Sequence, residues 1–219
     1  MAIKTQGTIV YMQTALANAK TISGASLGSP GAGAVTVTAT SHGYSADNII
    51  KITGVSGMQQ INNRAFVVAA APGTNTFVLK GTHAASYTAY SSGGSAYVAT
   101  MTAIGEVTSI SEMGGTDPQE IDVSHLQSLS ASKLAGNPTQ SNISFNVWFD
   151  LTASLHNDLV IANQDLADRV FWFYKPASFH MTVLAQVGGV KVTAGDVNSA
   201  YSATVTLIPR AAGSWALTT

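Results

Sequence analysis

Runs in which apolar and polar residues alternate recur along this chain, and they constrain its fold more than any other feature. The alternating runs are Val35–Ala39, Ile143–Phe149 and Tyr201–Leu207, and the short apolar runs Ile9–Met12 and Val170–Tyr174 accompany them. In the second of these runs, Ile143, Phe145, Val147 and Phe149 share one face. A period of two is typical of strands with one buried face. β-branched and aromatic residues are also common in these runs, as strands prefer. The sequence therefore predicts a mainly β fold.

One segment has a helical period instead. Its apolar stripe consists of Leu155, Leu159, Ala162 and Leu166. Spacings of three and four residues place such a stripe on one face of a helix. Thr152 or Ser154 is expected to cap the start, and Asp158 falls in an early turn. Strands before and after it predict a helix packed on a sheet or across the end of a barrel.

The chain divides into two predicted parts. Residues 21–98 are rich in glycine and poor in charge, and turn signals separate their short strands, so they predict a small all-β module. Residues 1–20 and 99–219 hold the helix and the longer strands. If the run Ile9–Met12 pairs with later strands, the module is an insertion into a larger β domain.

A long stretch with weak periodicity, residues 111–142, interrupts the second part. Loops beyond roughly 12–15 residues are uncommon in compact domains and are usually functional or disordered. Two interpretations remain open: a solvated hairpin tip, or an arm that becomes ordered on a neighbouring subunit. Under the second, the candidate contact residues are Glu112, Asp117, Glu120, Asp122, His125 and Lys133.

Charge is scarce throughout the chain. Charged residues make up 10% of it, against roughly 25% in an average domain, and the net charge is −1. Low net charge favours association, and the lack of basic excess argues against tight binding of DNA phosphates. Neither a secretory signal nor a membrane-spanning run of about 18 apolar residues is expected, so the sequence indicates a soluble cytoplasmic protein.

The sequence contains little that could support catalysis. It has no cysteine, which excludes disulfides, thiolate metal sites and thioester chemistry. The segment Gly24–Gly28 fits Gly-x-Ser-x-Gly, but Ser29 and Pro30 follow where a nucleophile elbow needs a helix, so a hydrolase using Ser26 has little support. There is no phosphate-binding loop and no ligand-like spacing of the five histidines, which are His42, His83, His125, His156 and His180. We expect no enzyme activity, no cofactor and no metal.

Within the predicted module, the order of motifs resembles a known kind of domain. The motifs are the strand Val35–Ala39, Ser41-His42-Gly43, Ile49 to Met58, Asn63-Arg64-Ala65-Phe66 and Asn75 to Leu79. This order is similar to small β-barrel modules of phage virion proteins and to the first catalytic cysteine half-domain of ubiquitin-activating enzymes. The resemblance implies a contact or decoration element without chemistry.

The remainder of the chain resembles the major tail tube proteins of lambda-type siphophages. The resemblance rests on Gly7–Tyr11, Ile104–Ile110, the long arm, the strand Ile143–Phe149, the helix and the last strands. It implies a tail-tube β-sandwich or barrel with one packed α-helix, plus the inserted module on the outer surface. Hexameric rings would stack into a tube, and residues 111–142 would reach the adjacent ring.

The same resemblance implies partners and a location. The partners are other copies of the chain and the tape measure, tail tip and terminator proteins. DNA would pass through the lumen during ejection without specific binding, and no membrane would be involved. The protein would assemble in the host cytoplasm and end in the virion tail. The alternative is a decoration or host-binding β-module protein of the tail.

Overall fold

The computed structural model describes residues 6–27, 33–70, 72–83, 86–124, 130, 132–150, 152–194, 196 and 199–217. The first strands are β1 (Ile9–Thr21), β2 (Gly24–Leu27), β3 (Val35–Thr38), β4 (Ile49–Thr53), β5 (Arg64–Val67), β6 (Thr76–Leu79), β7 (Ser95–Ile104) and β8 (Val107–Met113). They are followed by β9 (Thr116–Asp122), β10 (Lys133–Gln140), β11 (Ile143–Trp148), β12 (Arg169–Lys175), β13 (Phe179–Thr193), β14 (Ser202–Pro209) and β15 (Ser214–Leu217). The helix α1 (Ser154–Asp165) lies between β11 and β12, and a single 3-10 turn, Gln59–Ile61, precedes β5.

One antiparallel sheet of ten strands forms the frame of the molecule. Its order is β5-β4-β7-β1-β12-β13-β14-β11-β8, and β15 pairs with the first residues of β13. The two end strands, β5 and β8, do not pair with each other, so the sheet of the described residues stays open. A mainly β fold with one helix is therefore confirmed. Of the two predicted forms, sandwich or barrel, the described part of the chain forms no closed barrel.

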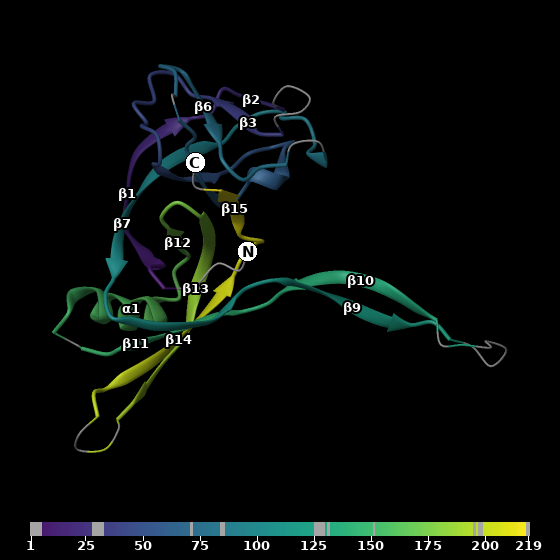
Figure 1. Cartoon of the computed structure of the whole chain (residues 1–219). Helices are drawn as coiled ribbons and strands as arrows, with labels where there is room; N and C mark the ends of the chain where they lie inside the picture. The colour runs from purple at the N-terminus through teal and green to yellow at the C-terminus, as the bar shows by residue number, and fades with distance from the viewer. Residues whose placement is uncertain are drawn as a thin grey trace.

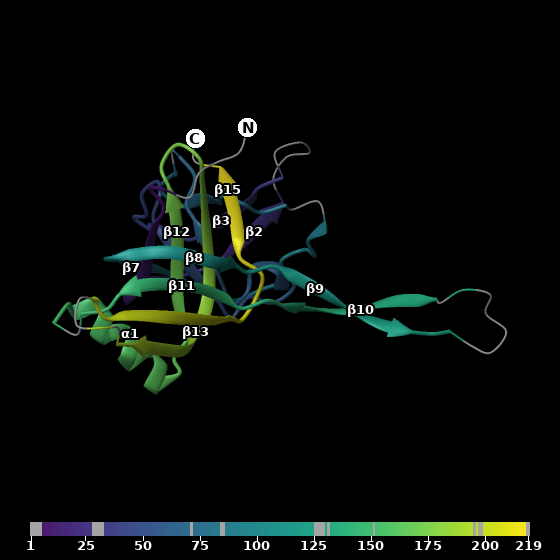
Figure 2. The same cartoon turned by 60° about the horizontal axis from the view of Figure 1, so that its bottom comes forward.

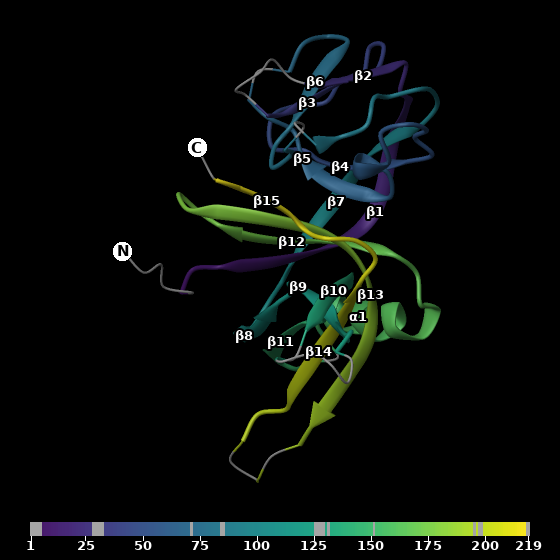
Figure 3. The ribbon, with the colours of Figure 1, turned by 90° about the vertical axis from the view of Figure 1, so that its right-hand side faces the viewer.

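The long strand β13 carries the sheet from one layer to another. Its first residues, Phe179–Ala185, pair with β12, and residues 185–193 pair with β14, with a register shift between Val187 and Gly189. Figure 3 shows β1 and β12 in one layer and β11 and β14 in a second layer below it. Each layer contributes one apolar face to the space between them. The resulting core holds Phe145 and Phe173, whose rings meet edge to face at 6.3 Å.

The strand predictions agree with the burial of this core. Ile143, Phe145 and Val147 are fully buried along β11, and Phe149 packs against the same cluster. The run Ile9–Met12 is also a strand, but β1 continues to Thr21.

Helix α1 covers part of this core. Leu155, Leu159 and Ala162 are buried as the stripe predicts. Leu166 is a miss: it adopts a left-handed conformation at the C-cap, ends the helix and is 55% exposed. The predicted caps are also wrong, because the N-cap is Ala153 and makes no side-chain cap bond.

A second apolar core lies above the first. Its side chains come from residues 22–98, and a small sheet of β2, β3 and β6 covers it. Strand β4 pairs with β7, and β5 pairs with β4, so both extend the large sheet. A third cluster joins Ile49, Ala65 and Val67 to Val170 and Leu184. Residue 21 lies in β1 and residue 98 lies in β7, so both boundaries of the segment 21–98 fall inside strands of the large sheet. The description of this segment as an inserted module therefore stays a prediction.

Candidate assembly surfaces

A two-stranded hairpin projects from the body of the molecule. Strands β9 and β10 pair antiparallel and extend the β8–β11 pair outward, as Figures 1 and 2 show. The stretch expected to lack periodicity is therefore mostly strand. All seven residues of β9 are exposed, because no other element covers either face of the hairpin. We call β9 and β10 together the arm.

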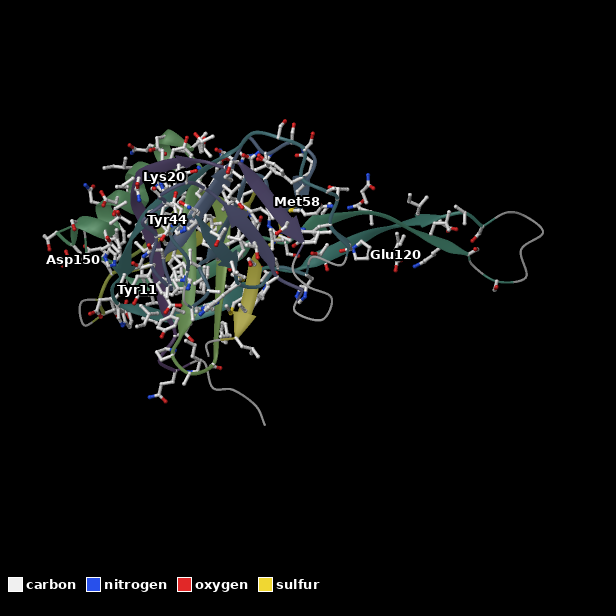
Figure 4. All side chains as sticks on the ribbon, turned by 90° about the horizontal axis from the view of Figure 1, so that it is seen from above. Tyr11, Lys20, Tyr44, Met58, Glu120 and Asp150 are labelled. Carbon is white, nitrogen blue, oxygen red and sulfur yellow. The ribbon has the colours of Figure 1, made fainter. Side chains whose placement is uncertain are left out.

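The predicted arm charges make contacts within the arm itself. Glu120 forms an ion pair with Lys133 on the opposite strand, with both side chains more than half exposed; Figure 4 shows Glu120 on the arm, far from Tyr11 and Asp150 on the body. Exposed pairs of this kind contribute little stability. A carboxylate oxygen of Asp117 accepts a hydrogen bond from the Ser141 hydroxyl at 2.6 Å.

The remaining predicted residues are placed differently. The hydroxyl and backbone N–H of Ser124 both donate to Asp122, and these bonds hold the pKa of the Asp122 carboxyl below its usual range. Glu112 lies on β8, opposite Ser144, and not on the arm. His125 lies outside the described residues. The role of these residues in assembly stays a prediction.

Sequence reasoning missed an apolar pair on the arm. Ile121 and Leu134 stand directly opposite each other across the two strands and are 52% and 59% exposed. Val123, one residue beyond β9, is exposed as well. Large apolar side chains exposed together mark contact sites more often than single ones do. Only the register of the two strands brings this pair together, and that register cannot be predicted from the local sequence pattern.

Glycines mark the joint between arm and body. Gly114 has a φ of +74°, and a Cβ there would lie 3.2 Å from the side chain of Ile143. Both features favour glycine at this position. The Ser141 N–H donates to the Gly115 carbonyl at 3.1 Å, so the two chain segments are close together where the arm begins.

A polar sheet surface is the second feature of interest. It is the face of β8, β11, β14 and the second half of β13 that points away from the core; its central residues are Ser109, Ser144, Asn146, Lys191, Thr204 and Thr206. We call it the polar face. Asn146 donates to the Ser109 hydroxyl at 2.9 Å and accepts from the Thr204 hydroxyl at 2.7 Å. Three strands are thus joined by side-chain hydrogen bonds.

The residues examined for catalysis are not arranged as an active site. Ser26 lies within strand β2, paired with Thr36, and not at a strand-to-helix turn. His156 is buried and its ring nitrogens lie near the backbone of Asp150 and Gly105. Among the described residues, no three His, Asp or Glu side chains are grouped so that they could hold a metal ion.

One further observation concerns membranes. In the part of the chain that the structure describes, no helix has the length and apolar character needed to cross a bilayer.

Comparison with known proteins gives one result that covers most of the chain. The family model of the phage tail tube protein, TTP, matches residues 56–212, which include the arm and all four strands of the polar face. No curated protein matches the chain. The family is structural and not catalytic, so the prediction that the chain is not an enzyme is confirmed. Because the match spans well over half of its residues, the chain belongs to the phage tail tube protein family, whose members are structural proteins of the virion tail.

Proposed function

We propose that copies of this chain close into hexameric rings and that the rings stack into the tail tube of a lambda-type siphophage. DNA passes through the lumen during ejection without specific binding. Assembly takes place in the host cytoplasm, and tape measure, tail tip and terminator proteins set the length and the ends of the tube.

The arm is the observation that carries this proposal. A two-stranded hairpin without a covering layer is marginally stable in water, and this one exposes Ile121 and Leu134 to solvent. Burial of the pair against another copy would remove that apolar surface from water. The contact joins two different surfaces, an arm and a receiving site, and such heterologous contacts generate open-ended filaments where the repeat does not close on itself. The arm therefore supports stacking of rings.

The composition supports the conducting role. Many cationic contacts would hold DNA through the release of counterions. With 10 basic and 11 acidic residues in 219, the chain has a low capacity for such contacts.

The module of residues 21–98 is proposed to face outward. Figure 3 shows its strands β2, β3 and β6 at the end of the molecule opposite β11 and β14. If the polar face lies toward the tube axis, this end lies at the outer surface. The resemblance of this module to the first catalytic cysteine half-domain of ubiquitin-activating enzymes is part of the same proposal.

Excision of the arm tests the proposal. Removing residues 116–140 and joining Gly115 to Ser141 leaves a four-residue loop between Met113 and Ile143, which are already paired. The shortened chain should unfold at the same temperature as the full chain, because the arm covers no core. Electron microscopy should show no tubes. Tubes of normal length would contradict the assigned role of the arm.

A pair of substitutions separates the apolar contact from the arm as a whole. Ile121→Ser together with Leu134→Ser should leave the subunit folded and reduce tube formation at least tenfold. Ile161→Ser on α1 is the matched control, since Ile161 is also an exposed isoleucine, 44% accessible. Equal tube formation by the wild type, the double variant and Ile161→Ser would show that Ile121 and Leu134 do not contact another subunit.

A further inference from the structure

The arm has a counterpart at the opposite end of the same layer. Strand β11 begins opposite Met113, at the base of the arm, and ends at Trp148, opposite Ser202 at the start of β14. Beyond this point β13 and β14 project from the body as a pair, and Figures 1 and 2 show that they point away from the arm. We call residues 190–193 of β13 and 201–203 of β14 the tip.

The tip exposes an apolar pair of its own. Val192 pairs with Ala203, which belongs to the core side of the layer. The Phe149 N–H donates to the Tyr201 carbonyl at 2.8 Å, so Tyr201 continues the register of β11 and β14 on that side. Among the described residues the core cluster ends at Val190 and Ala203. Val192 and Tyr201 lie beyond it and are therefore 48% and 61% exposed.

A stack of rings brings the two exposed pairs within reach of each other. Copies that repeat along an axis all point the same way, so the arm of one copy extends toward the end of the next copy that lies away from that copy's own arm. The tip occupies that end. Ile121 stands five positions beyond Thr116, which places it roughly 17 Å outward at about 3.4 Å per residue. The arm is thus long enough to cross from one ring to the next.

A larger apolar groove is excluded as the receiving site by its position. This groove has a volume of about 860 Å³ and lies beside Phe179, Trp215 and Leu217. Trp215 also lines a small cavity together with Gly114 and Thr116, so the groove is at the base of the arm. In a head-to-tail stack, the arm of the previous copy approaches from the other end of the subunit, where the tip lies.

The area of the contact indicates that the tip meets a copy held in a ring and not a single free copy. A buried aromatic side chain contributes roughly 150–250 Å², so two half-exposed side chains on each partner supply only about 200 Å² per partner. A stable pair needs roughly 800 Å² per partner. One arm on one tip would therefore not hold two subunits together. Several such contacts between two rings would, because the first contact raises the effective concentration for the others.

We propose that the tip receives the arm of a second copy, with Val192 and Tyr201 packed on Ile121 and Leu134. This inference rests on the proposed tail tube function and names the site that receives the arm. Stacked rings then bury both exposed pairs of each subunit, which remain in water in a free subunit. The tyrosine supplies a large apolar ring, and its hydroxyl can stay at the wet rim of the contact.

The absence of cysteine from the chain allows a direct test of this contact. We would introduce Leu134→Cys and Tyr201→Cys together, assemble tubes, and bridge the thiols with a short flexible bis-maleimide. A contact along the tube axis should give a ladder of products that continues beyond six copies on a denaturing gel. A contact within a ring of six cannot pass the hexamer, and each single variant can give only dimers. Leu134→Cys with Leu27→Cys, an exposed leucine of the module, is the control and should give no ladder.

Substitutions test the same contact without a linker. Val192→Ser together with Tyr201→Ser should leave the melting temperature of the free subunit unchanged, because both side chains are exposed. The subunit concentration at which tubes form should rise by about tenfold or more, since apolar surface is no longer buried. Adding Ile121→Ser and Leu134→Ser should cause little further loss, because the same contact is already removed. Leu27→Ser is the matched control and should assemble as the wild type does.

The outcomes separate the receiving site from the function on which it rests. If wild-type chains form no tubes, the proposed function fails, and the receiving site fails with it. If tubes form but the Leu134/Tyr201 products stop at the dimer or at the hexamer, the tip does not receive the arm. Normal assembly of the tip variant, or a loss in the combined variant equal to the product of the two separate losses, would also overturn the contact. In these cases the tail tube function itself stands.

Discussion

Phe145 shows how a single side chain holds the two layers of the molecule together. Its ring is fully buried in β11 and packs edge to face on Phe173 from the other layer. Phe145→Ala should lower the free energy of unfolding by about 3–5 kcal/mol, because it removes buried apolar surface and leaves a cavity. Denaturant unfolding of unassembled subunits measures this loss.

Trp148 provides the matched control on the same strand. It points to the opposite face and is 47% exposed, so Trp148→Ala should change stability by less than about 1 kcal/mol. Equal losses for the two variants would show that the strand faces are assigned the wrong way round.

His180 should make the stability of the subunit sensitive to pH. It is 2% exposed, its Nε2 atom has no partner in the described structure, and it stands between Tyr174 of β12 and Ala216 of β15. Burial lowers the pKa of its imidazole below the usual 6.5; the nearby Lys80 lowers it further and Asp47 partly opposes this.

The sign of the effect follows from proton uptake. The unfolded chain binds a proton at this residue near pH 6.5, whereas the folded chain binds it only at lower pH. Stability is therefore complete above pH 6.5 and is lost as the pH falls toward the folded pKa, by at most about 1.4 kcal/mol per pH unit. Between pH 7.5 and 5, His180→Gln should show a shallower loss than the wild type. An unchanged slope in His180→Gln would refute the assignment.

At the scale of single elements, the sequence predicted what is buried better than where an element ends. The helix stripe was right for Leu155, Leu159 and Ala162, since burial follows the period of 3.6. The capping residues were wrong because Thr152 bonds the carboxylate of Asp150, through its N–H at 2.8 Å and its hydroxyl at 2.7 Å, and so does not cap α1. Short polar side chains form such local bonds in turns as readily as at helix caps.

The arm was not predictable as a pair of strands for a related reason. Alternation reports a buried face, and β9 has none. The apolar contact pair, Ile121 and Leu134, stands 13 positions apart in sequence and becomes visible only through the register of the hairpin. What the sequence did provide was the polarity and the length of the segment.

The whole molecule depends on pairings that no local pattern encodes. Residues about 160 positions apart, such as Met12 and Phe171, are neighbours in the sheet, and the sheet of the described residues stays open because its end strands, β5 and β8, do not pair. The pattern of alternating runs is the same for an open sandwich and for a barrel, so sequence reasoning left both in place. Local patterns also do not decide whether the chain divides into two domains. Strands β1 and β7 run through both proposed parts and link the apolar cores of those parts.

Deletion of the module tests that division. The Ile22 N–H donates to the Gly94 carbonyl at 2.9 Å, so residues 23–93 can be replaced by an Asn-Gly turn that joins β1 to β7. If residues 21–98 were an independent decoration, their deletion would leave the melting temperature of the remaining domain unchanged. The structure predicts otherwise, because β4 and β5 place Ile49, Ala65 and Val67 over Val170 and Leu184.

Removal of that cover would expose an apolar patch on β12 and β13, and it would break the bond from the Thr182 hydroxyl to the Ala65 carbonyl at 2.7 Å. The shortened chain should therefore unfold at a lower temperature and associate non-specifically in light scattering. Adding Val170→Thr and Leu184→Thr should restore solubility but not the original melting temperature, since the lost packing is not replaced. A truncated chain that stays monomeric and melts with the full chain would identify residues 21–98 as a detachable domain. The expected result makes residues 21–98 a part of the fold and not a separate domain.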